Sequence, residues 1–157
     1  MELLQHLHPD FKEFLELLNA HSVRYLVVGG YAVAFHGYPR ATGDIDIWIE
    51  IAPDNANQMV RVVRDFGFGG LGYTAADFQE PGTVIQFGVS PIRIDILTEI
   101  DGVSFPTAFA LRETPLLDGI PVSIISLHDL QRNKAATGRA QDQVDLARLT
   151  APPADPT

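Results

Sequence analysis

Residues 44–51 read DIDIWIEI, in which isoleucine alternates with Asp, Asp, Trp and Glu without a break. Successive side chains of a β-strand point to opposite faces, so this pattern predicts a strand with one isoleucine face. Asp44 and Asp46 then share the other face, with Cβ atoms roughly 6–7 Å apart given the rise of a strand. The chain must therefore build a sheet that buries one side and presents a carboxylate pair on the other.

A second alternating segment, Ile92–Leu97, carries Asp95 and Arg93 on its polar face, and residues 84–87 precede it across a turn. If the two alternating strands are neighbours, three carboxylates converge. Their mutual repulsion amounts to several kcal/mol even at an effective dielectric of about 20. Such oxygen ligands favour Mg²⁺ or Mn²⁺, and a pair of these ions activates an attacking oxygen and stabilises a leaving pyrophosphate. An ordinary solvated sheet face remains the alternative interpretation.

Gly29 and Gly30 follow a short apolar strand, Tyr25–Val28, and precede a short helix predicted over residues 31–36. A turn of this kind lets backbone N–H groups approach a phosphate, although glycine pairs also occur in ordinary strand–helix turns.

Arg40 and Thr42 stand just before the aspartate pair. An arginine there suits a phosphate or an acceptor, and a surface arginine in a loop is the alternative.

The remaining pattern predicts a mixed α/β (α+β) fold, in which a mixed β-sheet has helices packed on one face and a C-terminal helical pair. Residues 1–150 form a single domain, and residues 151–157, APPADPT, are expected to be disordered. The expected helices span residues 10–20, 31–36, 53–66, 104–110, 127–136 and 141–149, and a further strand spans residues 120–125.

The chain has 20 Asp and Glu against 11 Lys and Arg, a net charge of -9, which disfavours a nonspecific nucleic-acid binder. Cysteine is absent, so disulfides and thiolate metal sites are excluded. The first residues lack the pattern of a signal peptide, and no stretch approaches the ~20 apolar residues that span a bilayer. We expect a cytoplasmic protein without a membrane partner.

The string GGYAVAFHGYPRATGDIDIWI, with Ile94-Asp95-Ile96 further on, resembles the polymerase-β-type nucleotidyltransferase superfamily. It is similar above all to small bacterial members grouped with abortive-infection and toxin–antitoxin nucleotidyltransferases. The resemblance implies a nucleotidyltransferase-like fold, with Asp44, Asp46 and Asp95 as catalytic metal ligands. Many members have Ser where this chain has Gly30, so any phosphate contact there must come from the backbone.

The C-terminal segment LHDLQRNKAATGRAQDQVDLARL agrees with this resemblance, which implies that Lys134 contacts the nucleotide triphosphate. Asp142 and Asp145 would brace the turn or position Lys134 and Arg139. The alternatives are a solvated lysine, a helix-capping Asp142 and an Asp145 paired with Arg148. His36 and Trp48, which lie beside the motif, are expected to have packing roles.

The expected activity is Mg²⁺- or Mn²⁺-dependent transfer of an NMP from an NTP to an acceptor hydroxyl, with release of pyrophosphate. Gly29, Gly30, Arg40, Thr42 and Lys134 are the predicted nucleotide-binding residues. The acceptor stays open among tRNA, a protein and a small molecule such as an antibiotic, and a cognate toxin or antitoxin is a candidate partner. The alternative is a non-catalytic toxin–antitoxin module that uses the same fold only for binding.

Overall fold

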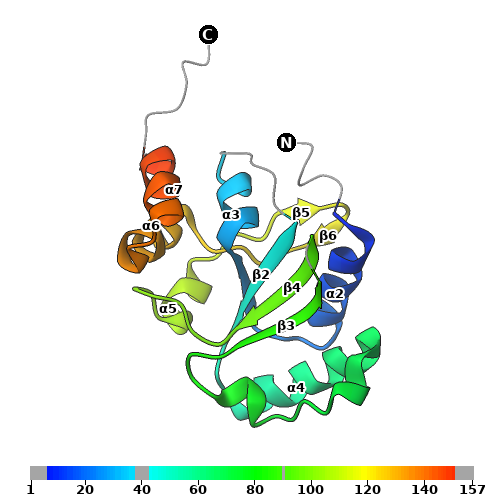
Figure 1. Ribbon diagram of the computed structural model, residues 1–157. Helices are drawn as coiled ribbons and strands as arrows, with labels where there is room; N and C mark the ends of the chain where they lie inside the picture. The colour runs from blue at the N-terminus through cyan, green and yellow to red at the C-terminus, as the bar shows by residue number, and fades with distance from the viewer. Residues whose placement is uncertain (1–6, 38–42, 90, 151–157) are drawn as a thin grey trace.

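A computed structural model describes residues 7–37, 43–89 and 91–150 (Figure 1). Its centre is a four-stranded sheet in the order β1-β2-β4-β3. Strands β1 and β2 are antiparallel, as are β3 and β4, whereas β2 and β4 are parallel. The sheet is therefore mixed, as the sequence predicted. The strands span Tyr25–Val28 (β1), Asp44–Ile49 (β2), Val84–Val89 (β3) and Ile92–Leu97 (β4).

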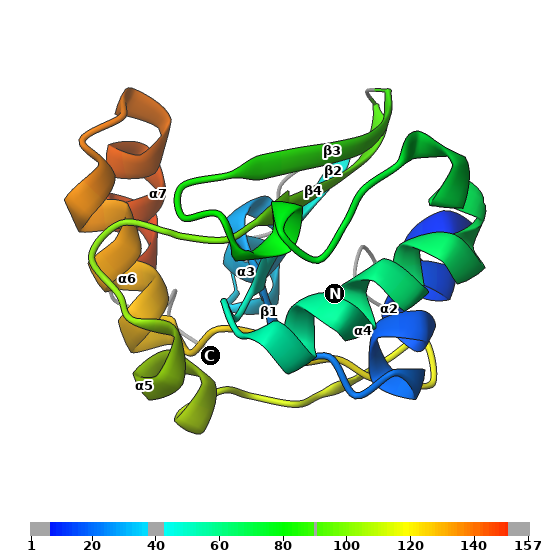
Figure 2. The same ribbon diagram turned by 90° about the horizontal axis from the view of Figure 1, so that it is seen from below.

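The isoleucine faces of β2 and β4 form the part of the hydrophobic core that the sheet contributes. Ile45, Ile47, Ile94 and Ile96 are all buried. Helices α2 (Pro9–Ala20) and α4 (Pro53–Val63) cover this face (Figure 2), and the Phe14 ring of α2 lies 6.3 Å from the Phe87 ring of β3. Burial of these side chains holds the polar face of β2 and β4 in one orientation, because a slip of one residue would invert both faces.

The C-terminal helices stand at the other side of the sheet. Helices α6 and α7 pack against each other, as the predicted helical pair requires. Helix α6 starts where the Ser126 hydroxyl caps the Asp129 N–H at 3.2 Å, and it ends at Gly138 with φ +71°. The elements on this side are α3 (Gly29–Phe35), α5 (Phe105–Ala110), α6 (Leu127–Thr137) and α7 (Ala140–Thr150).

Three boundaries differ from the sequence prediction. The first short helix begins at Gly29 itself, so the glycine pair forms its first turn. The regular part of α4 ends at Val63, and a wide turn over Arg64–Phe68 follows, in which Gly67 has φ +100°. The expected strand over residues 120–125 shrinks to Ile120–Pro121 (β6), paired with Leu116–Leu117 (β5), and beyond it Ile124 forms isolated bridges with Val27 and Glu113.

The chain beyond β6 forms backbone hydrogen bonds with β1 of the main sheet. Val27 donates its N–H to the Ser123 carbonyl at 2.8 Å, and Ile125 donates to the Val27 carbonyl at 3.2 Å. These bonds cover the outer edge of β1. Short 3-10 turns at Gly69–Leu71 and Asp77–Gln79 complete the described elements. The predicted tail, residues 151–157, lies outside the described residues. Within the described ranges, every helix is too short or too polar to cross a bilayer.

Candidate active site

The parallel register of β2 and β4 brings two of the predicted carboxylates level. Asp46 pairs with Asp95 across the two strands, and both belong to the polar face. Asp44 lies on the same face of β2, two residues before Asp46, and it pairs with Arg93. Asp95 is buried, with 6% of its surface exposed. The two alternating strands are therefore neighbours, which was the condition for Asp44, Asp46 and Asp95 to converge.

Arg93 joins two of these acids. Its Nε donates to Asp95 Oδ1 at 2.7 Å and its Nη2 to Asp95 Oδ2 at 3.0 Å, a two-bond contact. The same Nη2 lies 3.1 Å from Asp44 Oδ2. The spacing Arg-Ile-Asp on an alternating strand is the sequence signal for this pair, since residues two apart share a face. The sequence interpretation placed Arg93 on the polar face and assigned it no role.

Asp46 carries the least compensated negative charge of the three. Burial, together with the charge of Asp95, a hydrogen bond with Asp95 and the charge of Asp44, raises its pKa to about 6. The ammonium of Lys134 acts in the opposite direction. The protein thus holds an acid that is costly to ionise, as expected where an external cation belongs.

The raised pKa predicts how stability varies with pH in the absence of metal. Between the ordinary value of 3.8 and about 6, folded Asp46 keeps its proton while unfolded Asp46 loses it. The free energy of unfolding therefore falls as pH rises through this window, by about 2 to 3 kcal/mol from this group. Asp46→Asn is uncharged throughout, so its stability relative to wild type should rise by that amount between pH 4 and pH 7.

Denaturant unfolding of both proteins at a series of pH values, with EDTA present, checks this expectation. Acids that do not interact with Asp46 contribute equally in both proteins and cancel in the difference, so the change reports on Asp46 and the acids beside it. A difference that stays flat between pH 4 and pH 7 contradicts the prediction.

Gly29 is placed against Asp46. It has φ +67°, and a Cβ added there would lie 2.1 Å from Asp46 Oδ2. Gly30 is buried in the first turn of α3. The close approach of backbone to carboxylate therefore requires a residue without a side chain at position 29.

Gly29→Ala should destabilise the protein by about 2–4 kcal/mol, because left-handed backbone strain and a collision with Asp46 add together. Gly72→Ala is the matched control: it has φ +78° and no atom within 4 Å of the added Cβ, so it tests strain alone. Thermal denaturation of both variants measures the two costs. Equal losses of stability would show that the contact with Asp46 is unimportant.

Lys134 lies at the centre of a buried charge cluster on α6 and α7. Its Nζ donates to Asp142 Oδ1 at 2.7 Å and lies 3.3 Å from Asp145 Oδ2, and only 5% of its side chain is exposed. Asp142 Oδ2 accepts from Thr137 Oγ1 and from Arg139 Nε, both at 2.7 Å. Burial alone would raise the pKa of Asp142, but its bonds to Lys134, Thr137 and Arg139 outweigh this and lower it.

A pocket of about 250 Å³ joins this cluster to the sheet carboxylates. Asp46 lines this pocket together with Lys134 and Arg139. The Arg139 side chain is 77% exposed, so its guanidinium reaches solvent at the pocket's edge. The lining residues are Gly29, Gly30, Asp46, Lys134, Arg139, Gln141 and Asp142. Four of the predicted site residues therefore meet in one cavity, and Arg139 and Gln141 are additions that the sequence interpretation did not assign to it.

The donor set suits a divalent cation, since carboxylate oxygens are the ligands that Mg²⁺ and Mn²⁺ prefer. As the side chains stand, the described ranges contain no group of three or more His, Cys, Asp or Glu residues that could hold a metal ion. Arg93 instead contacts both Asp44 and Asp95. A cation at these acids would have to share or displace the Arg93 contacts. Asp44, Asp46 and Asp95 as metal ligands thus remain a prediction.

The other residues singled out from the sequence lie outside the pocket or outside the described part of the chain. Arg40 and Thr42 fall in residues 38–42, outside the described part of the chain. The His36 ring contacts the Ile125 carbonyl at 2.7 Å, which is a packing role. Trp48 is buried, and its ring meets Phe105 edge-on at 4.9 Å. Both residues therefore serve the scaffold around the site.

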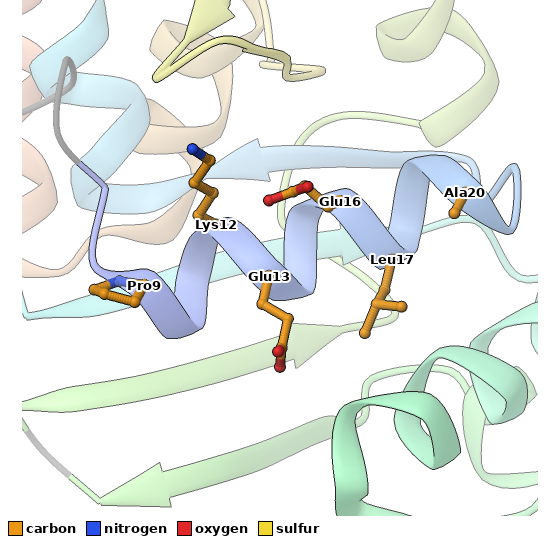
Figure 3. A pocket seen from close by; sticks show the side chains of 6 residues that line it. All are labelled: Pro9, Lys12, Glu13, Glu16, Leu17 and Ala20. Atoms are coloured by element: carbon orange, nitrogen blue, oxygen red, sulfur yellow. The ribbon is translucent and has the colours of Figure 1, made fainter.

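A second hollow runs along α2 (Figure 3). Its six lining side chains come from one helix and point in different directions, so no polar groups converge on a common point. They are Pro9, Lys12, Glu13, Glu16, Leu17 and Ala20. It carries charges of both signs, but they lie along one exposed helix and do not face each other across a cavity as the residues at Asp46 do.

The sheet, its level carboxylates and the helical pair define a nucleotidyltransferase-like fold. Solved structures of other proteins share this fold, among them the following three. A putative nucleotidyltransferase (TM1012) from Thermotoga maritima is 15% identical, with 92% of this chain and 94% of that chain covered and a TM-score of 0.60. An antigenic nucleotidyltransferase-like protein from Paracoccidioides brasiliensis is 14% identical, with coverage of 89% and 74% and a TM-score of 0.53.

The third structure is ANT(2")-Ia in complex with adenylyl-2"-tobramycin, which is 13% identical, with coverage of 88% and 84% and a TM-score of 0.51. The chain belongs to the family described as "Nucleotidyl transferase of unknown function (DUF2204)", whose family model matches residues 8–153. No curated protein matches the chain. Membership confirms the superfamily that the sequence resembled and implies an NTP substrate.

Proposed function

We propose that the protein transfers an NMP from an NTP to an acceptor hydroxyl and releases pyrophosphate, in a reaction that depends on Mg²⁺ or Mn²⁺. One observation carries the proposal: Asp46, which is level with Asp95 in the sheet, lines the same pocket as Lys134 and Arg139. A triphosphate bearing a divalent cation has the matching arrangement, with its metal toward the acids and its phosphates toward the cations.

The phosphate side of the pocket has three kinds of donor. Gly29 and Gly30 present backbone N–H groups from the first turn of α3, where helical partners are lacking. Lys134 supplies an ammonium, and Arg139 supplies an exposed guanidinium. Arginine and lysine differ here, because guanidinium binds phosphate through two parallel bonds and ammonium acts as a point charge.

The carboxylate side would hold the metal ions. Asp44 and Asp46 would bind both, and Asp95 would bind the one nearest the acceptor. When bound, the ions would lower the pKa of the attacking hydroxyl and neutralise charge on the leaving pyrophosphate. The protein supplies position and charge, which is the main requirement of phosphoryl transfer.

The acceptor oxygen forms a bond to the α-phosphorus, and the bond from that phosphorus to the oxygen bridging the α- and β-phosphates breaks. The bonding electrons and negative charge leave with pyrophosphate. The acceptor proton would pass to the Asp95 carboxylate.

The proposal has three versions, which differ in the molecule that accepts the NMP. A small-molecule acceptor is the version that the likeness to ANT(2")-Ia supports, since that protein was solved with an adenylylated tobramycin. A tRNA acceptor is weakened by the net charge of -9 and by the burial of Lys134, which removes it from any surface basic strip. A protein acceptor and a cytoplasmic toxin–antitoxin role rest on the sequence resemblance alone.

The deciding experiment incubates the protein with Mg²⁺ and each α-labelled NTP in a cell lysate, with Asp44→Ala as the inactive control. Label that enters a small molecule, a protein or RNA only with the wild-type protein identifies the acceptor. A non-catalytic binding module is the second candidate. In that case no label is transferred, and Mg²⁺ with any NTP leaves the melting temperature unchanged.

A further inference from the structure

Arg93 contacts the carboxylate oxygens of Asp44 and Asp95 that would bind a metal ion. It bonds both oxygens of Asp95 and lies 3.1 Å from an oxygen of Asp44, and its side chain is only 28% exposed. The acids come from two parallel strands, and their register places Arg93 opposite Asp44. The contact is therefore built into the sheet.

A guanidinium and a divalent cation compete for the same lone pairs. Two parallel bonds to one carboxylate are among the strongest that arginine forms, and they fix the direction of both oxygens. A metal ion of charge +2 beside an arginine also experiences direct repulsion. Both effects lower the affinity of the site for a free ion.

We propose that Arg93 is an internal counter-cation, which holds Asp44 and Asp95 in the metal-free protein and competes with the divalent cation for their oxygens. This inference rests on the proposed function, because it assumes that these acids receive a metal. An ion that arrives bound to a triphosphate needs fewer protein oxygens and carries less net positive charge. The competition would thus select the metal–NTP complex over the free ion.

The test measures Mn²⁺ binding to the purified full chain by electron paramagnetic resonance, without NTP. Arg93→Gln should bind free Mn²⁺ at least about tenfold more tightly than wild type, because the competing charge is gone. The same variant should melt at a lower temperature than wild type in EDTA. Its advantage in Mn²⁺ affinity should shrink when a non-hydrolysable NTP analogue is present.

Arg24→Gln is a matched control. Arg24 also bridges two acids, Glu50 and Asp54, at the far end of the β1–β2 pair. Its replacement should lower the melting temperature and leave the affinity for Mn²⁺ unchanged. A purely structural role for Arg93 would give the same result as Arg24→Gln. Arg93→Lys, which keeps a charge without the two-bond geometry, should show an intermediate affinity and serves if Arg93→Gln does not fold.

The outcomes separate this inference from the proposed function. If Asp46→Asn abolishes Mn²⁺ binding but the Arg93 variants bind no more tightly than wild type, the role of Arg93 is overturned and the metal site stands. If Mn²⁺ binding is the same with and without Asp46, both the metal site and the role of Arg93 are overturned. Tighter binding by Arg93→Gln, with no change in Arg24→Gln, supports the inference.

Discussion

Asp46→Asn is expected to lower the rate of NMP transfer at least about a thousandfold, with no loss of stability at pH 7. Asparagine has nearly the same shape as aspartate and cannot supply a negative oxygen to a cation. It also removes the burial cost and the repulsion from Asp95 and Asp44 that raise the pKa of Asp46. Loss of activity and gain of stability should therefore occur in one variant, which an unfolded or misfolded protein cannot imitate.

Label transfer from an α-labelled NTP and thermal denaturation in EDTA measure the two effects. Asp54→Asn is the control, since Asp54 is an exposed acid paired with Arg24 away from the pocket. It should keep full activity. An Asp46→Asn protein that retains activity within about tenfold would remove Asp46 from the chemistry.

Lys134→Met should destabilise the protein by about 3 kcal/mol at pH 7 and raise the KM for NTP. The ammonium is buried with Asp142 and Asp145, so its loss leaves two buried carboxylates without this cation. Methionine keeps the apolar stem and its packing. Because the Lys134 contact helps to lower the pKa of Asp142, the stability that it provides is lost as pH falls, and the difference from wild type should be smaller at pH 4 than at pH 7.

Adding Asp145→Asn should recover part of the lost stability. Asp142 keeps its bonds to Thr137 and Arg139 in the double variant, whereas the charge of Asp145 is removed. The KM for NTP should stay raised, because the triphosphate still lacks the Lys134 ammonium. Denaturant unfolding and NTP-dependent initial rates separate these effects. A double variant less stable than Lys134→Met would contradict the account of the charge cluster.

The sheet could be predicted because its strands alternate. The period of two in β2 and β4 places each isoleucine and each acid on a face, and the structure follows both assignments. The alternation in β2 and β4 does not indicate which strands lie next to each other in the sheet. The parallel register that sets Asp46 level with Asp95 depends on tertiary packing, and the family resemblance implied only that Asp95 is a third carboxylate on a strand.

The contacts of the arginine side chains were harder to predict. Arg93 stood on the predicted polar face, but a local pattern does not tell a solvated arginine from one that bridges Asp44 and Asp95. Arg139 follows Gly138, whose φ of +71° turns α6 toward α7, and that turn decides which cavity the arginine borders. The strand predicted over residues 120–125 is shorter because its later part is divided between two partners: Ile124 forms single bridges with Val27 and with Glu113.

The pocket takes its two sides from opposite ends of the chain: Gly29 and Asp46 come early, and Lys134, Arg139 and Asp142 come late. A ribosome therefore makes the acidic side long before the basic one. Until α6 and α7 emerge, a nascent chain carries the carboxylates without the residues proposed to grip a triphosphate. On the proposed mechanism, the enzyme stays inactive during its own synthesis and gains activity only as the last helices dock.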